Sequence, residues 1–305
     1  MILQETACYL CEHCEESQFQ QKIITKKMKI SCYNTFASGA NLTQQTSFLA
    51  DAGFDAFELV GMHNELTELL PEIKSIISKG IISVSAICAI HRGWLIDPDI
   101  EMQRAAKEDI TKLLDLAGEI GNCGVFVIPI LGCTNAYPGA PNTGRSPEDD
   151  RNLLINQLSL LAKRAKQAGT MLWLEVINRY ESPVANTLAE GAAIIKAVGS
   201  SSCLLTADFF HMNIEEADLP GALDQYSQYL GHIHAGDSTR TYPGFGQLDY
   251  PSLIRALVAN KYSGYLTVDS NNRMDPGKVL PHIAAFLKST IGLALQRIQF
   301  ENEVI

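Results

Sequence analysis

The sequence predicts a single α/β domain folded as a closed (β/α)8 barrel, a TIM barrel, with a short N-terminal extension. Eight short apolar runs alternate with eight amphipathic helical patterns, which is the element order of such a barrel. No shift in composition divides the 305 residues, and 46% hydrophobic residues suffice for one large core. Four residues that can bind a metal stand at the ends of the later runs, where functional residues of a TIM barrel lie.

The predicted strands are short apolar runs whose side chains alternate between two faces. They are expected at residues 29–34, 54–60, 82–89, 124–129, 171–176, 204–208, 231–235 and 265–269. Apolar positions with helical spacing predict helices at residues 42–53, 65–79, 99–121, 148–169, 188–198, 219–229, 250–260 and 276–296. Glycines near several helix ends, such as Gly169 and Gly199, suit a left-handed cap. Runs without edge-type polar alternation favour a closed barrel over an open doubly wound sheet.

The barrel is expected to span residues 28–296, followed by a C-terminal tail at residues 297–305. Residues 1–27 are polar and unpatterned and are expected to form a disordered extension. Within the extension, the cysteines at positions 8, 11 and 14 form a CxxCxxC pattern that could begin a metal or iron–sulfur site. A loose tail is the favoured interpretation, because no fourth ligand is evident beyond His13 or Cys32.

The overall composition favours a small-molecule substrate. The formal net charge of −10 repels phosphate backbones and no basic patch is evident, so no nucleic-acid partner is expected. No apolar run approaches the roughly 18 residues of a membrane span, and the first residues lack the pattern of an export signal. A cytoplasmic location without a membrane partner is therefore expected, while the assembly state stays open, a homo-oligomer included.

Four acidic or histidine residues each end a predicted strand, and together they predict a metal site. They are Glu175, Asp208, His234 and Asp269. Their separations are each close to the roughly 30 residues of one strand-helix unit, so one ligand comes from each consecutive unit. Three oxygen ligands and one nitrogen ligand suit one divalent ion, Mn²⁺ first, with Co²⁺ or Mg²⁺ as alternatives.

Two further residues on the predicted strands carry polar side chains that could support this site. Glu58, near the end of the second strand, could hold a substrate hydroxyl or form a structural salt bridge. His232 shares a face with His234 but lies one layer deeper, so a packed or supporting role is favoured.

Several segments of the second half resemble the sugar phosphate isomerase and epimerase superfamily, whose fold is the xylose isomerase-like TIM barrel. The segments are LEVINRYE at 174–181, DFFHMNIEE at 208–216, HIHAGDSTR at 232–240 and PGFG at 243–246. The nearest relatives by these motifs are the ketose 3-epimerases of the D-tagatose and D-psicose type. The resemblance spans roughly residues 28–288 and is most specific in the second half.

The resemblance implies roles for individual residues. Glu175, Asp208 and His234 match three ligands of the family's divalent metal, and Glu175 also matches one of its two acid/base groups. At the fourth position the family has a glutamate that is both ligand and second acid/base, whereas this chain has Asp269. Losing one methylene draws the carboxylate back by about 1 Å, a displacement that can cost about a hundredfold in rate.

The resemblance also implies substrate-binding residues in the loops that follow the ligand-bearing strands. His211 and Arg240 match residues that hold the sugar's oxygens, and Glu181 matches a glutamate near the reacting hydroxyl. Loops of this kind build the mouth of a barrel, so a small-molecule sugar is the expected partner.

The residue types fit proton transfer next to a ketone. A divalent metal stabilises the charge of a cis-enediolate, and Glu175 and Asp269, one on each face, can remove and return the proton as acid/base catalysts. Return to the same carbon inverts it, which predicts a metal-dependent ketose 3-epimerase, while return to the neighbouring carbon gives aldose–ketose isomerisation. The alternatives are a metal-dependent lyase that dehydrates an inosose or dehydroshikimate, a DNA repair endonuclease, which is disfavoured by the acidic charge, and a weakly active sugar-binding relative.

Overall fold

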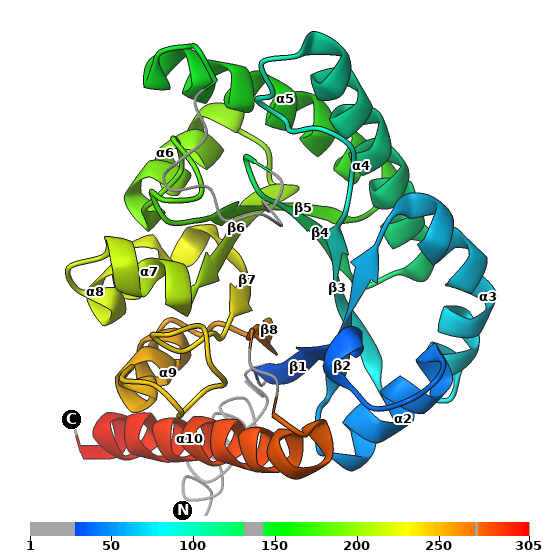
Figure 1. The fold of residues 1–305 in the computed structure, drawn as a ribbon. Helices are drawn as coiled ribbons and strands as arrows, with labels where there is room; N and C mark the ends of the chain where they lie inside the picture. Colours follow the sequence, from blue (N-terminus) through cyan, green and yellow to red (C-terminus); the bar gives the residue numbers. More distant parts are fainter. Residues whose placement is uncertain (1–27, 131–142, 272–273, 305) are drawn as a thin grey trace, which may run out of the picture.

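Eight parallel strands form a closed barrel in the computed structural model, which describes residues 28–130, 143–271 and 274–304 (Figure 1). Each strand pairs with its neighbours in chain order, and β1 closes the ring against β8. The strands are β1 (Lys29–Tyr33), β2 (Ala56–Gly61), β3 (Ser83–Ala89), β4 (Gly124–Val127), β5 (Met171–Val176), β6 (Cys203–Asp208), β7 (Leu230–His234) and β8 (Tyr265–Val268). The predicted (β/α)8 fold is confirmed.

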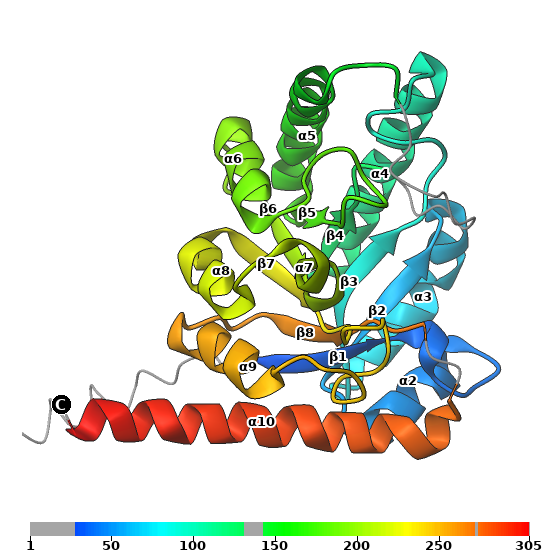
Figure 2. The same ribbon diagram turned by 60° about the vertical axis from the view of Figure 1, so that its left-hand side comes forward.

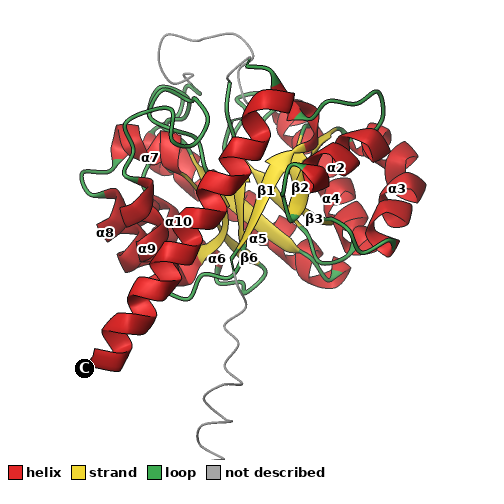
Figure 3. Cartoon of the chain, turned by 90° about the horizontal axis from the view of Figure 1, so that it is seen from below, coloured by secondary structure: helices red, strands yellow, loops and turns green. Residues whose placement is uncertain are grey.

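Helices surround the barrel on its outer side, as Figure 3 shows. They are α2 (Leu42–Asp51), α3 (His63–Ser78), α4 (Ile100–Ile120), α5 (Pro147–Ala168), α6 (Leu188–Val198), α7 (Phe209–Glu215), α8 (Leu219–Tyr226), α9 (Tyr250–Ala259) and α10 (Pro276–Val304), with 3-10 turns η1 (Asn34–Phe36) and η2 (Ser227–Tyr229). Gly169 and Gly199 end α5 and α6 with φ of 72° and 64°, the left-handed caps that the sequence predicts.

The last helix is longer than expected from the sequence. α10 does not end at Gln296 but continues to Val304 and runs past the barrel (Figure 2). An ion pair of 3.0 Å between Glu301 of α10 and Arg255 of α9 holds its final turns. Glu301 also pairs with Arg297 at 3.2 Å. α10 is long and apolar enough to cross a membrane by composition alone, yet its apolar face packs on α9 and β1. The extension at residues 1–27, with its CxxCxxC, lies outside the described residues.

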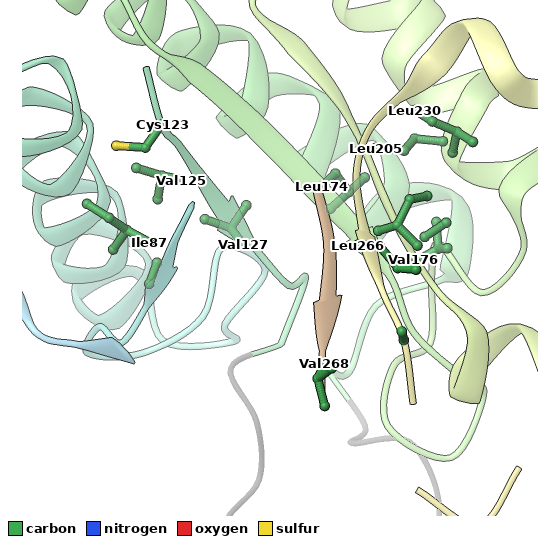
Figure 4. Packing of buried hydrophobic residues seen from close by; sticks show 14 of the residues in the cluster. Ile87, Cys123, Val125, Val127, Leu174, Val176, Leu205, Leu230, Leu266 and Val268 are labelled. Atoms are coloured by element: carbon green, nitrogen blue, oxygen red, sulfur yellow. The ribbon is translucent and has the colours of Figure 1, made fainter. Parts of the chain in front are cut away.

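The strands separate two environments. Their outward side chains, such as Val125, Leu174 and Leu205, are fully buried against the helices (Figure 4). The inward side chains fill the barrel with a mixture of aromatic and polar groups. A small cluster of Tyr33, Ala86, Phe126 and Trp173 lies there, beside fully buried polar residues. These polar residues are Ser31, Glu58, Ser85, Thr206, His232 and Thr267. A polar interior near the carboxyl ends of the strands is suited to hold a polar site.

Trp173 fits the barrel interior because two neighbouring strand positions are glycines. An added Cβ at Gly124 would lie 2.6 Å from the Trp173 ring, and one at Gly231 would also collide with it. Gly124→Ala is therefore expected to destabilise the fold by about 1–3 kcal/mol through overpacking, measured by urea unfolding. Gly292→Ala in α10, where no atom of the described residues lies within 4 Å of an added Cβ, is the control and should be neutral or stabilise by up to about 1 kcal/mol. Equal stability of both variants would contradict this packing.

Candidate metal centre

Three of the four predicted ligands meet at the carboxyl ends of adjacent strands. Glu175 lies in β5, Asp208 ends β6 and His234 ends β7. One potential ligand atom of each lies within 4.8 Å of the others, and all three side chains are buried. Side chains alternate between the two faces of a strand. The residue directly before each candidate ligand packs outward against the helices, so the ligand itself points into the barrel. These outward residues are Leu174, Ala207 and Ile233.

The two carboxylate oxygens of Asp208 differ in their hydrogen bonding. Its Oδ1 accepts a hydrogen bond of 2.8 Å from the backbone N–H of Phe210 and so caps the short helix α7. Its Oδ2 is buried and has no hydrogen-bond partner among the residues that the structure describes. A buried, unpartnered carboxylate oxygen is costly unless something positive fills the space. The residue set therefore fits a cation held at this atom.

His234 is held between two carboxylates. Its Nδ1 lies 2.9 Å from Oε1 of Glu175, and its Nε2 lies 3.2 Å from Oε1 of Glu58. Burial opposes protonation of His234, but the charges of Glu175 and Glu58 outweigh it and raise its pKa well above the ordinary value. Both ring nitrogens therefore carry protons, with Nδ1 donating to Glu175 and Nε2 to Glu58.

Glu58 lies beneath this group and joins two histidines. Its Oε2 accepts a hydrogen bond of 2.7 Å from Nε2 of His232. Burial opposes ionisation of Glu58, but His234 and His232 outweigh it and lower its pKa to about 2. Of the two roles that the sequence left open for Glu58, the structure shows the buried ion pair.

Asp269 directly follows β8 and is paired with Arg240. Its Oδ2 accepts a hydrogen bond of 3.0 Å from the Arg240 guanidinium, which also lies 5.0 Å over the Phe210 ring. Among the described residues, the groups whose ligand atoms all lie within 4.8 Å do not include Asp269. Arg240 adopts φ of 53° in a loop that Asp237 organises by accepting backbone N–H bonds, one of them from Gly244 at 2.9 Å.

His211 and Glu181 are linked by Asn178, which lies in the motif at 174–181 but has no role implied by the sequence. Nδ1 of His211 accepts hydrogen bonds from the backbone and side-chain N–H groups of Asn178, at 3.2 and 2.7 Å. The same amide donates to Glu181 at 2.8 Å. Burial lowers the pKa of His211 well below its usual value. His211 is therefore neutral with its proton on Nε2, 3.8 Å from Oδ2 of Asp208.

Metal affinity is expected to depend on pH through Asp208. Burial, reinforced by Asp269, raises the pKa of Asp208 to about 8 in the metal-free protein. A carboxyl must lose its proton to bind a metal, so affinity for Mn²⁺ should rise by at least about tenfold per pH unit up to about pH 8, and less steeply above it, where His234 still has a proton to lose. Calorimetric titration at a series of pH values checks this, and a flat profile below pH 8 would contradict it.

The fold and this site define the class of protein: a TIM barrel with a buried carboxylate and histidine cluster at the carboxyl ends of its strands. The family model for the xylose isomerase-like TIM barrel matches residues 47–290. The chain belongs to this family, and its relatives include proteins named ketose 3-epimerases.

Two curated relatives and one solved structure illustrate the similarity. The 3-dehydro-D-guloside 4-epimerase of Escherichia coli K12 is 30% identical over 263 residues, which cover 86% of this chain and 100% of the relative. The D-psicose 3-epimerase of Agrobacterium fabrum is 31% identical over 227 residues, covering 72% and 76%. The crystal structure of E. coli 3-keto-D-glucoside 4-epimerase superposes with a TM-score of 0.78 at 29% identity, covering 86% and 100%.

Proposed function

We propose that this protein is a divalent-metal-dependent sugar epimerase that inverts a hydroxyl-bearing carbon next to a ketone, with C3 of a ketose as the reacting position. The observation that carries the proposal is the convergence of Glu175, Asp208 and His234 within 4.8 Å at the mouth of the barrel. Relatives named D-psicose and L-ribulose 3-epimerase support the reaction class.

Glu175 and Asp269 are the proposed acid/base pair, and each works on one face of the sugar. Glu175 removes the proton from the carbon next to the ketone, which leaves a planar cis-enediolate. Asp269, oriented by Arg240 at 3.0 Å, delivers a proton to the opposite face of the same carbon. The configuration inverts, and the reverse reaction exchanges the two roles.

Glu175, Asp208 and His234 are the proposed metal ligands, with Asp269 as the fourth. When bound, a divalent cation, Mn²⁺ first among the candidates, supplies the positive charge that makes the C–H next to a ketone sufficiently acidic. The free, buried Oδ2 of Asp208 supports this assignment.

Substrate oxygens are the proposed partners of His211, Arg240 and Glu181. His211 offers an Nε2–H donor, because both hydrogen bonds from Asn178 end on its Nδ1. Arg240 adds charged donors beside Asp269, and Glu181, whose side chain is 41% exposed, adds an acceptor at the open side. These groups match the alternating hydroxyls of a sugar.

A second candidate is epimerisation at C4 of a 3-keto sugar or glycoside. The observation that favours it is the match to a 3-dehydro-D-guloside 4-epimerase along that relative's whole length. The chemistry is the same, because C4 is also next to the ketone in such a substrate.

Incubation in D₂O with Mn²⁺ tests both candidates. Free ketoses and 3-keto-glycosides are supplied separately, and NMR follows deuterium at the carbons next to the ketone together with the appearance of the epimer. The proposal expects deuterium at the inverted carbon, and the substrate that reacts identifies C3 or C4. Absence of exchange on every sugar would overturn the proposal, and a conjugated enone would indicate a lyase.

A further inference from the structure

We propose that Glu58 is a positioning residue that aims His234 at the metal by accepting the hydrogen bond of its Nε2–H. Glu58 itself is proposed to touch neither substrate nor metal. The inference rests on the metal site proposed above, and it assigns a role to a carboxylate of β2, on a different side of the barrel from the ligand strands.

The contacts of Glu58 make it a bridge between two histidines of one strand. Oε2 lies 2.7 Å from Nε2 of His232, and Oε1 lies 3.2 Å from Nε2 of His234. All three side chains are fully buried, so water does not compete for these bonds. His232 and His234 share a face because they are two residues apart in β7. One carboxylate therefore fixes both rings.

The bridge is itself held rigidly from below. Trp173 stacks on His232 with ring centroids 5.0 Å apart and an angle of 5° between the planes. Trp173 in turn fits against Gly124 and Gly231. His232 cannot tilt without disturbing this stack, so the Glu58 carboxylate that it holds is fixed relative to β7. Phe126 adds an edge contact to His234 at 4.6 Å.

The contact between Glu58 and Nε2 of His234 leaves the other ring nitrogen, Nδ1, facing the candidate ligand Glu175. A neutral imidazole carries its proton on one nitrogen, and the partner of that nitrogen decides which. When Nδ1 loses its proton to bind a metal, the acceptor at Nε2 keeps the other proton there and leaves the lone pair on Nδ1, the atom that lies 2.9 Å from Glu175. A carboxylate behind a metal-binding histidine also increases its basicity, and loss of such a partner typically costs about 10- to 100-fold in metal affinity.

Zinc binding by three purified variants and the parent protein tests the inference without relying on turnover. Glu58→Leu removes the acceptor and should weaken Zn²⁺ binding by about 10- to 100-fold, measured by competition with a chelating indicator. Glu58→Gln keeps an acceptor oxygen and should recover part of the loss. His232 can then change tautomer, because its Nδ1 has no partner within the described part of the chain. Ser85→Ala is the matched control: it removes a fully buried polar group that bonds to Ser31 at 2.7 Å and should bind Zn²⁺ like the parent protein.

A second measurement uses the unmodified protein, so it holds even if Glu58→Leu fails to fold. Histidine-selective ¹⁵N NMR of the Zn²⁺-loaded protein should show a protonated, hydrogen-bonded Nε2 on His234. An unprotonated Nε2, or wild-type zinc affinity in Glu58→Leu, overturns the role of Glu58 and leaves the metal site standing. A zinc ion bound by Glu58, His232 and His234, whose potential ligand atoms also lie within 4.8 Å of one another, would overturn it as well. Absence of zinc binding by the parent protein would sink the metal site itself.

Discussion

Replacing Glu175 by glutamine is expected to lower kcat by about 10³- to 10⁴-fold, because the amide can no longer take a proton from carbon. It is also a poorer ligand than a carboxylate for a divalent cation. Glu175 lies 2.9 Å from Nδ1 of His234 and is buried. Steady-state turnover of the ketose identified in D₂O measures the loss.

Glu119→Gln provides the matched control for this change. Glu119 is an exposed carboxylate of α4 that pairs with Lys74 at 3.5 Å, and its loss should leave kcat unchanged. Glu175→Gln with turnover within about tenfold of the parent protein would contradict the assignment, since general acid/base groups contribute at least about 10².

Asp269→Asn is expected to separate proton exchange from epimerisation. Glu175 remains able to remove and return a proton on its own face, so one epimer should still take up deuterium without inverting. Delivery to the opposite face is lost, and interconversion should fall by about 10²- to 10⁴-fold. NMR of each pure epimer in D₂O measures exchange and inversion side by side.

The control for Asp269→Asn is the same substitution at Asp275, an exposed residue before α10 that pairs loosely with Lys278 at 3.9 Å. It should affect neither exchange nor inversion. Two results would contradict the division of roles: normal interconversion by Asp269→Asn, or complete loss of exchange from both epimers. Asp269→Glu gives the side-chain length that the resemblance implies for this position, and its turnover shows whether Arg240 holds the shorter carboxylate in a productive place.

The barrel could be predicted because each strand-helix unit carries its own local pattern. Glu175, Asp208 and His234 could also be placed together, since strand alternation and the common direction of parallel strands bring the ends of β5, β6 and β7 side by side. The short helix α7 was not among the predicted helices, because seven residues are too few for a periodic pattern. It begins where Asp208 caps Phe210, a side-chain contact that no period encodes.

Contacts across the barrel were beyond the reach of sequence reasoning. Glu58 and His232 are far apart in the chain, and their 2.7 Å contact joins β2 to β7, strands that are not neighbours in the sheet. The pairing of Asp269 with Arg240 similarly depends on a loop whose conformation Asp237 sets through backbone hydrogen bonds. Both features arise from closure of the barrel and from loop geometry rather than from a local pattern.

The central claim is that one divalent cation is held by Glu175, Asp208 and His234. A crystal grown with Mn²⁺, with anomalous data collected to locate manganese, tests it directly. The account predicts one strong peak in contact with the carboxylates of Glu175 and Asp208 and with Nδ1 of His234, displacing the contact now made between His234 and Glu175. Full occupancy of manganese elsewhere, with the 2.9 Å contact between His234 and Glu175 intact, would contradict it.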